Sequence, residues 1–267
     1  MGTSRNEKKK RNLLTPDSWY RLASGISLWL IPSEPESALL KQLMSRHPKS
    51  SAPHSYPHFH PHVTLATISP SPAPATKPDD PAAASPSSPS DPDPDPDPAT
   101  LVLALREAIP LGQRALRTRF ARVLAGDHYF RSIYAALAPS TELAQLRAAV
   151  AGAATAGGGG EGKSGPAPPA FPHLSLFYIA DEEAHARVRL LQELEREGVV
   201  RHSADGLSVA LRCGAGDGDR GGDGDGGGED DGVLEGCTCT QIWIVDCEGP
   251  VEEWKVLDKI LLATSDR

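Results

Sequence analysis

Two short segments of the chain share one pattern of histidine, apolar residue, hydroxyl residue and leucine: residues 62–65 (HVTL) and residues 173–176 (HLSL). Histidine has an ordinary pKa of about 6.5, so its side chain can accept or donate a proton near neutral pH. A hydroxyl can donate a hydrogen bond to an oxygen that gains negative charge during a reaction. Two imidazoles and two hydroxyls in one cleft would suit the hydrolysis of a phosphodiester without a metal ion.

Each motif begins a run of apolar, β-branched and aromatic residues, at 62–68 and at 173–179, and such runs predict strands. Side chains alternate between the two faces of a strand. His62 and Thr64 therefore share one face of the first strand, and His173 and Ser175 share one face of the second. One histidine beside a hydroxyl is ordinary in a protein core, but the same pattern at the start of two strands favours a functional site.

The doubled motif resembles that of the 2H phosphoesterases, the superfamily that includes the bacterial LigT-type RNA enzymes. More narrowly, the chain is similar to the fungal and plant cyclic phosphodiesterases, also called 2′,3′-cyclic-nucleotide 3′-phosphodiesterases. The segments that support this narrower likeness follow one another in the expected order: 25–32, 59–65, 129–134, 171–178 and 245–254.

The resemblance implies an α+β fold with two lobes, in which two antiparallel sheets line a central cleft, helices lie outside, and each lobe supplies one motif. It implies hydrolysis of 2′,3′-cyclic nucleotides to nucleoside 2′-phosphates. It also implies hydrolysis of ADP-ribose 1″,2″-cyclic phosphate, a by-product of tRNA splicing, to ADP-ribose 1″-phosphate. His62 and His173 would be the catalytic acid and base, in an order that the sequence leaves open, and Thr64 and Ser175 would bind the phosphate oxygens.

Two aromatic residues occupy positions where the family has aromatic side chains: Tyr178, which follows the second motif, and Trp29 in the first strand. Both are candidates for stacking on a base or ribose, and both are also compatible with packing in the core. Phe130 and Arg131 are further candidates, although an arginine on a strand is more commonly solvated.

Strand, helix and motif strand are expected to occur twice along the chain, which predicts an α+β protein with two similar lobes. Strands are expected at 24–31, 62–68, 116–124, 130–137, 173–179, 207–213 and 240–246. Helices are expected at 35–47, 101–109, 141–154 with Thr141 as its N-cap, 181–197, and 250–262 with Pro250 in its first turn.

Four segments lack the apolar residues that a core needs and are expected to be disordered: a basic tail at 1–18 and inserts at about 69–100, 155–170 and 214–236. The rest of residues 19–267 is expected to form a single bilobal domain. The two acidic inserts account for the net charge of −8, which leaves the core nearly neutral. This excludes a broad basic surface for long nucleic acid. We expect a monomer that binds a small cyclic phosphate.

Three sequence patterns resemble other ligand-binding motifs, but the residues around each pattern do not fit the motif. Residues 157–164 (GGGGEGKS) match a P-loop, but a proline-rich run follows in place of a helix. The Asp/Gly run at 217–225 lacks the ligand spacing and the flanking helices of a calcium loop. The histidines at positions 54, 58, 60 and 62 are interrupted by prolines, and no nearby acid or cysteine completes a metal site. We therefore expect no metal and no cofactor.

The four cysteines, Cys213, Cys237, Cys239 and Cys247, lack zinc-binding spacing and are expected to be reduced and buried in strands. The sequence has neither an apolar run of 18 residues nor the apolar stretch of a signal peptide. A soluble, intracellular, cytoplasmic protein is expected. Members of the similar fungal family are associated with the Golgi, and the resemblance implies the same association for this chain.

Two other functions share these features. A LigT-type enzyme acting on 2′,5′ linkages or terminal phosphates of RNA would use the same motifs. A non-catalytic nucleotide-binding or scaffold module would use the inserts as interaction segments, but the intact histidines and hydroxyls of both motifs favour an enzyme.

Overall fold

The computed structural model describes residues 25–50, 52, 54–68, 98–156, 172–214 and 232–263. Its strands are β1 (Ile26–Pro32), β2 (Val63–Ile68), β3 (Leu116–Ala125), β4 (Ile133–Leu137), β5 (His173–Phe177), β6 (Val200–His202), β7 (Val209–Arg212), β8 (Val233–Leu234), β9 (Gly236–Asp246) and β10 (Lys255–Leu261). Its helices are α2 (Glu34–Met44), α3 (Pro98–Ala108), α4 (Thr141–Ala156) and α5 (Ala184–Arg196), with short 3₁₀ turns η1 (Tyr129–Arg131), η2 (Asp181–Glu183) and η3 (Val251–Glu253). The expected α+β fold is confirmed.

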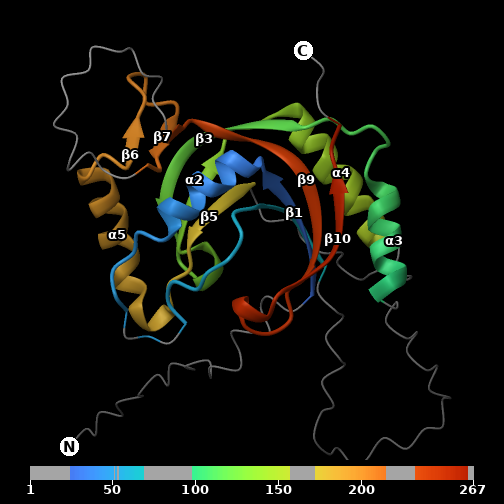
Figure 1. Cartoon of the computed structure of the whole chain (residues 1–267), viewed down its shortest axis with the longest axis horizontal. Helices are drawn as coiled ribbons and strands as arrows, with labels where there is room; N and C mark the ends of the chain where they lie inside the picture. The colour runs from blue at the N-terminus through green and yellow to red at the C-terminus, as the bar shows by residue number, and fades with distance from the viewer. Residues whose placement is uncertain are drawn as a thin grey trace, which may run out of the picture.

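Seven strands form one antiparallel sheet in the order β1-β2-β5-β4-β3-β9-β10, and β9 also pairs with β1. This extra pairing closes the sheet into the barrel-like ring seen in Figure 1. The two sheets expected of the two lobes are thus joined at their edges. Strands β6, β7 and β8 form a separate small sheet.

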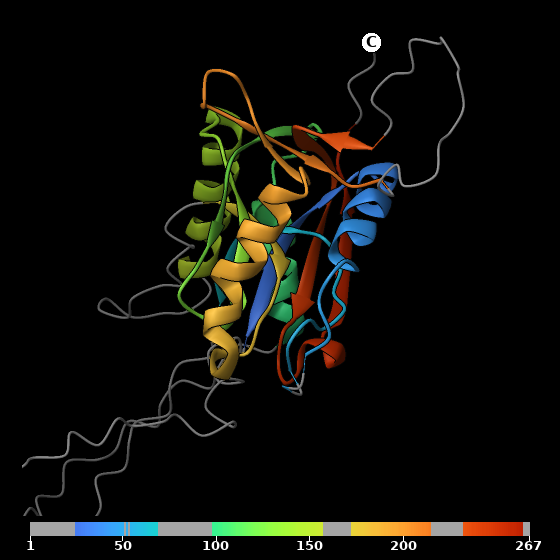
Figure 2. The ribbon, with the colours of Figure 1, turned by 90° about the vertical axis from the view of Figure 1, so that its left-hand side faces the viewer.

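The expected repeat of strand, helix and motif strand is present as β1-α2-β2 and β4-α4-β5. Each helix contacts the motif strand of the other unit, since α4 packs on β2 and α2 packs on β5. Figure 2 shows α2 and α4 on opposite sides of the molecule, with α5 between them in that view. The arrangement brings the two motif strands together as neighbours in the sheet.

Apolar side chains that alternate along the strands pack with leucines of the helices to form the main core. Its fully buried members include Leu28, Leu30, Leu40, Leu43, Val63, Leu65, Leu105, Leu174 and Leu176. A smaller cluster on the opposite face of β1 and β9 contains Trp29, Ile31, Val245 and Cys247, with Trp243 and Trp254 packed against it. Both motif strands therefore have their apolar face in the main core, which leaves the histidine face directed to the other side.

The helix expected at 250–262 is wrong: the chain forms η3 and then β10, which pairs with β9. Pro250 could begin a helix, but β9 offers a free edge whose backbone groups need partners, and pairing there outweighs local preference. The predicted N-cap Thr141 is also wrong by one residue. The Ser140 hydroxyl accepts the N–H of Leu143, and so Ser140 caps α4.

Three boundaries of the expected disordered inserts are also corrected. Residues 98–100 belong to α3, residues 155 and 156 belong to α4, and residues 232–236 include β8 and the first residue of β9. Most of each insert and the tail at 1–18 lie outside the described residues.

The four cysteines are reduced and buried, as expected. Among the described helices, none is both long and apolar enough to cross a lipid bilayer.

Candidate active site

The two motifs meet where β2 and β5 pair, with Val63 opposite Leu174. In an antiparallel ladder the neighbours of such a pair also face each other, so His62 lies across from Ser175 and Thr64 lies across from His173. Val63 and Leu174 are fully buried in the core, and alternation places the four polar side chains on the other face. Each histidine therefore lies across from the hydroxyl of the other motif. The sequence predicts that the four side chains share one cleft, and this cross-strand arrangement is added by the structure.

His62 is buried, with 3% of its surface exposed, and its ring stacks on Trp29 with centroids 3.7 Å apart and planes 9° apart. Its Nδ1 lies 2.7 Å from the carbonyl oxygen of His60. Because a carbonyl only accepts hydrogen bonds, Nδ1 must bear the proton, which leaves Nε2 with a free lone pair.

Burial lowers the pKa of His62 to about 3, against the smaller opposing effect of the His60 carbonyl. The nearby His60 and His173 imidazoles lower the pKa further. A positive charge on either neighbour would disfavour a second positive charge on His62. His62 is therefore a neutral imidazole near pH 7, able to accept a proton and unable to donate one from a cationic form.

His173 is the first residue of β5 and is 9% exposed. Its ring packs edge-on against Tyr134 of β4, with centroids 5.1 Å apart. Tyr134 in turn lies opposite Ser175 in the β4–β5 ladder. Strand β4 thus flanks the second motif, and its position beside the histidine was not apparent from the sequence.

The motif hydroxyls differ in their surroundings. Ser175 is buried and donates a hydrogen bond to the carbonyl of Phe130 over 3.2 Å. It also hydrogen-bonds the Tyr178 side chain, but burial has the larger effect and raises the pKa of Tyr178. Thr64 is half-buried and lies opposite Trp29 in the β1–β2 ladder. Both hydroxyls thus lie on the face that carries the histidines.

A group of aromatic side chains, which we call the aromatic wall, continues from His62 along this side of the molecule. It comprises Trp29, Phe59, Phe130, Tyr178 and Trp254. Phe59 stacks on Tyr178 at 4.2 Å, Phe130 faces Trp254 at 5.9 Å, and Trp254 meets Trp29 at 5.6 Å. These contacts link the segment after the second motif to the ring that supports His62.

Only part of the aromatic wall is accessible. Trp29 is 4% exposed because it packs between the His62 ring and a cluster that includes Ile31 and Val245. Tyr178 is 3% exposed and stacks against Phe59. Phe59, Phe130 and Trp254 are half-buried. Sequence reasoning missed Phe59 and Trp254: Phe59 precedes the first motif by three residues, a detectable signal, whereas Trp254 lay in the segment expected to be helical.

Other candidate residues lie apart from the motifs or have other partners. Arg131 forms an ion pair of 2.8 Å with the exposed Asp127 and lowers the pKa of that carboxyl group. His60 tilts against Trp243, with centroids 4.5 Å apart. His58 lines a cavity of about 360 Å³ beside α2, which Phe59, His60 and Leu176 also line. Within the described ranges, no group of three histidines, cysteines or acids could hold a metal ion.

A family described as "Cyclic phosphodiesterase-like protein" matches residues 98–262, which include the second motif but begin after the first. Among solved structures, the chain is similar to the crystal structure of E. coli LigT complexed with 3′-AMP. That match has 10% sequence identity and a TM-score of 0.43, and it covers 90% of this chain and 98% of that chain. No curated protein matches.

Proposed function

The chain belongs to the family of cyclic phosphodiesterase-like proteins, and from this premise we propose that it hydrolyses five-membered cyclic phosphates with His62 and His173 as its acid–base pair. The observation that supports the proposal most strongly is the pairing of Val63 with Leu174. This pairing brings both histidines and both motif hydroxyls to one face of neighbouring strands. Proton transfer by the histidines and hydrogen bonding by the hydroxyls would proceed without a metal ion.

In the proposed reaction, a water oxygen attacks the phosphorus atom and the bond from phosphorus to one ring oxygen breaks. One histidine takes the proton of the attacking water. The other gives a proton to the ribose oxygen that leaves, so no alkoxide is released. The sum is the addition of one water molecule across the phosphorus–oxygen bond, which yields a phosphate monoester.

The neutral state of His62 supports its assignment as the general base. Its Nδ1 proton is bound to the His60 carbonyl and its Nε2 can accept. A pKa of about 3 leaves His62 uncharged in the resting protein, and an anionic phosphate beside the ring would raise its basicity. His173 is then the general acid, which protonates the leaving oxygen.

Thr64 and Ser175 would donate hydrogen bonds to the non-bridging oxygens, where negative charge grows in the transition state. In the free protein Ser175 donates to the Phe130 carbonyl. A bound phosphate oxygen would compete with that carbonyl for the same proton. An anionic oxygen is the stronger acceptor, so substrate binding would redirect the Ser175 hydroxyl.

For the substrate, we infer the class that the likeness to fungal and plant cyclic phosphodiesterases implies: 2′,3′-cyclic nucleotides, opened to 2′-phosphates, and ADP-ribose 1″,2″-cyclic phosphate, opened to ADP-ribose 1″-phosphate. Half-buried Phe59, Phe130 and Trp254 offer apolar surface near the motifs for a base or ribose. Tyr178 and Trp29 would act mainly by supporting that surface and His62.

The proposal is tested by incubating the wild-type protein with each of these two substrates in excess chelator and identifying the product by phosphorus NMR. We expect turnover without metal, and a nucleoside 2′-phosphate from the cyclic nucleotide. A 3′-phosphate product would contradict the ring-opening direction. Absence of turnover on both substrates, together with cleavage of 2′,5′-linked RNA oligonucleotides, would favour the LigT-type function instead.

A further inference from the structure

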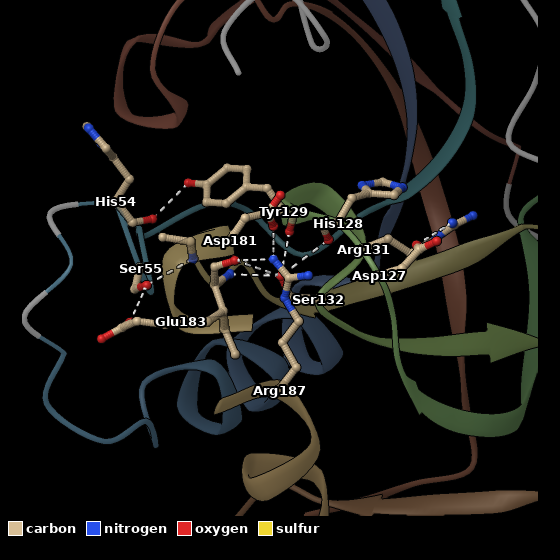
Figure 3. Close-up of polar contacts among 12 residues, drawn as sticks. His54, Ser55, Asp127, His128, Tyr129, Arg131, Ser132, Asp181, Glu183 and Arg187 are labelled. Atoms are coloured by element: carbon tan, nitrogen blue, oxygen red, sulfur yellow. Dashed lines mark hydrogen bonds and ion pairs between the residues drawn. The ribbon is translucent and has the colours of Figure 1, made fainter. Parts of the chain in front are cut away.

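Arg187 of α5 is a buried arginine, 1% exposed, whose guanidinium reaches the chain just beyond the second motif. Its Nη2 donates to the Ile179 carbonyl over 2.8 Å and forms an ion pair with Asp181. Figure 3 shows the guanidinium directed into a group of polar contacts. A buried charge is costly unless it is paired and hydrogen-bonded, so this position is more specialised than a solvated helical arginine.

A second set of contacts joins the same segment to the turn that contains η1. The fully buried Ser132 accepts the Ile179 N–H over 2.9 Å and donates to the Tyr129 carbonyl over 2.7 Å. Phe130 lies between Tyr129 and Ser132 in the sequence, and its carbonyl accepts the hydrogen bond from Ser175. The turn that Ser132 anchors therefore also accepts a hydrogen bond from a motif hydroxyl.

A third set joins the segment that leads to the first motif. The Ala180 N–H donates to the Ser55 hydroxyl over 2.9 Å, and Ser55 donates to Glu183 over 2.7 Å. The Tyr56 N–H donates to the Tyr178 carbonyl over 2.7 Å. Residues 54–56 are followed within a few positions by Phe59 and His62.

Segments 54–56 and 128–132 are therefore both hydrogen-bonded to segment 178–183, which is distant from them in sequence. Phe130 and Tyr178 of the aromatic wall lie within two of these segments, and Phe59 follows the third by three residues. We propose that Arg187 is a positioning residue that fixes segment 178–183, to which the other two segments are hydrogen-bonded, and that it thereby keeps the aromatic wall in register with the motif face. The proposal rests on the proposed function for its link to substrate. The pairing of Val63 with Leu174, which brings the two histidines to one face, does not involve Arg187.

The cyclic phosphate would be held by the motif residues, whereas a base would be held by the aromatic wall. Arg187→Met should therefore impair substrates that have a base and spare a substrate that is only a five-membered cyclic phosphate. A merely structural role would impair both equally.

The kinetic test compares a nucleoside 2′,3′-cyclic phosphate with glycerol 1,2-cyclic phosphate, which has the same ring and no base. For Arg187→Met we expect KM for the nucleoside substrate to rise about tenfold, the size of one lost base stack, while kcat changes little. Turnover of the glycerol substrate should stay near the wild-type value. Arg196→Met, at an arginine of the same helix whose side chain is 70% exposed, should leave both substrates unaffected. Equal losses on both substrates, or none, would overturn the proposal.

Hydrogen exchange tests the positioning role without any substrate. The amides of Tyr56, Ile179 and Ala180 donate to the tied segments, and Arg187→Met should speed their exchange about tenfold or more. The amide of Leu28, in the β1–β9 ladder, is the internal reference and should not change. Unchanged protection at the three amides would overturn the proposal.

Substrate kinetics and hydrogen exchange distinguish failure of the proposed function from failure of the positioning role of Arg187. If the wild-type protein turns over neither substrate, the proposed function fails, while hydrogen exchange still decides whether Arg187 holds the three segments. If Arg187→Met does not fold, Asp181→Asn removes the ionic partner with little change in shape. It should then produce the same selective pattern to a smaller extent, and an unselective pattern would overturn the proposal.

Discussion

Among single residues, His62 is the one whose neutral state matters most for the proposed chemistry. Burial holds the pKa of His62 to about 3, so the base form persists well below the ordinary histidine range. We therefore expect kcat/KM to show no acidic limb with a midpoint near pH 6.5 when it is measured from about pH 5 to pH 8. A midpoint near 6.5 that disappears in a His62 variant would show that His62 titrates as an ordinary histidine.

The same burial predicts a pH-dependent stability. In the unfolded chain His62 takes up a proton near its ordinary pKa of 6.5, whereas in the folded protein it does so only near 3. The unfolded state therefore binds more protons in this window, and the free energy of unfolding falls as the pH falls through it. Urea midpoints at about pH 7 and pH 5 should differ less in His62→Asn than in the wild type. An equal drop in both proteins would contradict the buried neutral state.

Residue types and spacing identified the four motif side chains, because alternation along a strand is a local rule. They did not identify the support around them. Trp29 was a stacking candidate from its position in the first strand, but only the folded chain shows that it covers the His62 ring. Arg187 was one charged residue among many in a predicted helix, and its burial results from contacts with residues distant in sequence.

At the scale of elements, the turn from β3 to β4 sets the place of Phe130. A Cβ added to Gly126 would overlap the backbone carbonyl oxygen of Arg131 and lie 3.2 Å from the Tyr134 ring. Gly126→Ala should lower the free energy of unfolding by about 1–3 kcal/mol in urea denaturation. The matched control is Gly152→Ala in α4, where an added Cβ meets nothing within 4 Å. It should raise stability by about 0.5–1 kcal/mol, and a similar loss in both variants would contradict the steric account.

The repeat of strand, helix and motif strand could be predicted because each unit has its own hydrophobic pattern. The strand at residues 255–261 could not be predicted in the same way. Residues 255–261 become a strand because β9 has a free edge beside them, and that edge is a property of the sheet. The closure of the sheet by the β1–β9 pairing joins residues more than 200 positions apart, beyond the reach of any local pattern.

At the scale of the whole molecule, composition predicts that the inserts are dispensable for catalysis. Replacing residues 69–97 with a short Gly/Ser linker joins Ile68 at the end of β2 to Pro98 at the start of α3. We expect kcat and Tm close to the wild-type values, because shortening a polar loop changes closure entropy only slightly. Loss of activity with the fold intact would contradict this, and loss of a binding partner alone would support the scaffold function. The monomeric state, the intracellular location and the Golgi association stay predictions.

Catalysis by two histidines is tested by single-turnover hydrolysis of a nucleoside 2′,3′-cyclic phosphate in excess chelator by His62→Asn and His173→Asn. Each variant should retain the far-ultraviolet circular dichroism of the wild type and lose roughly 10²–10⁴-fold in rate. A rate within about tenfold of the wild type in either variant would contradict the acid–base pair.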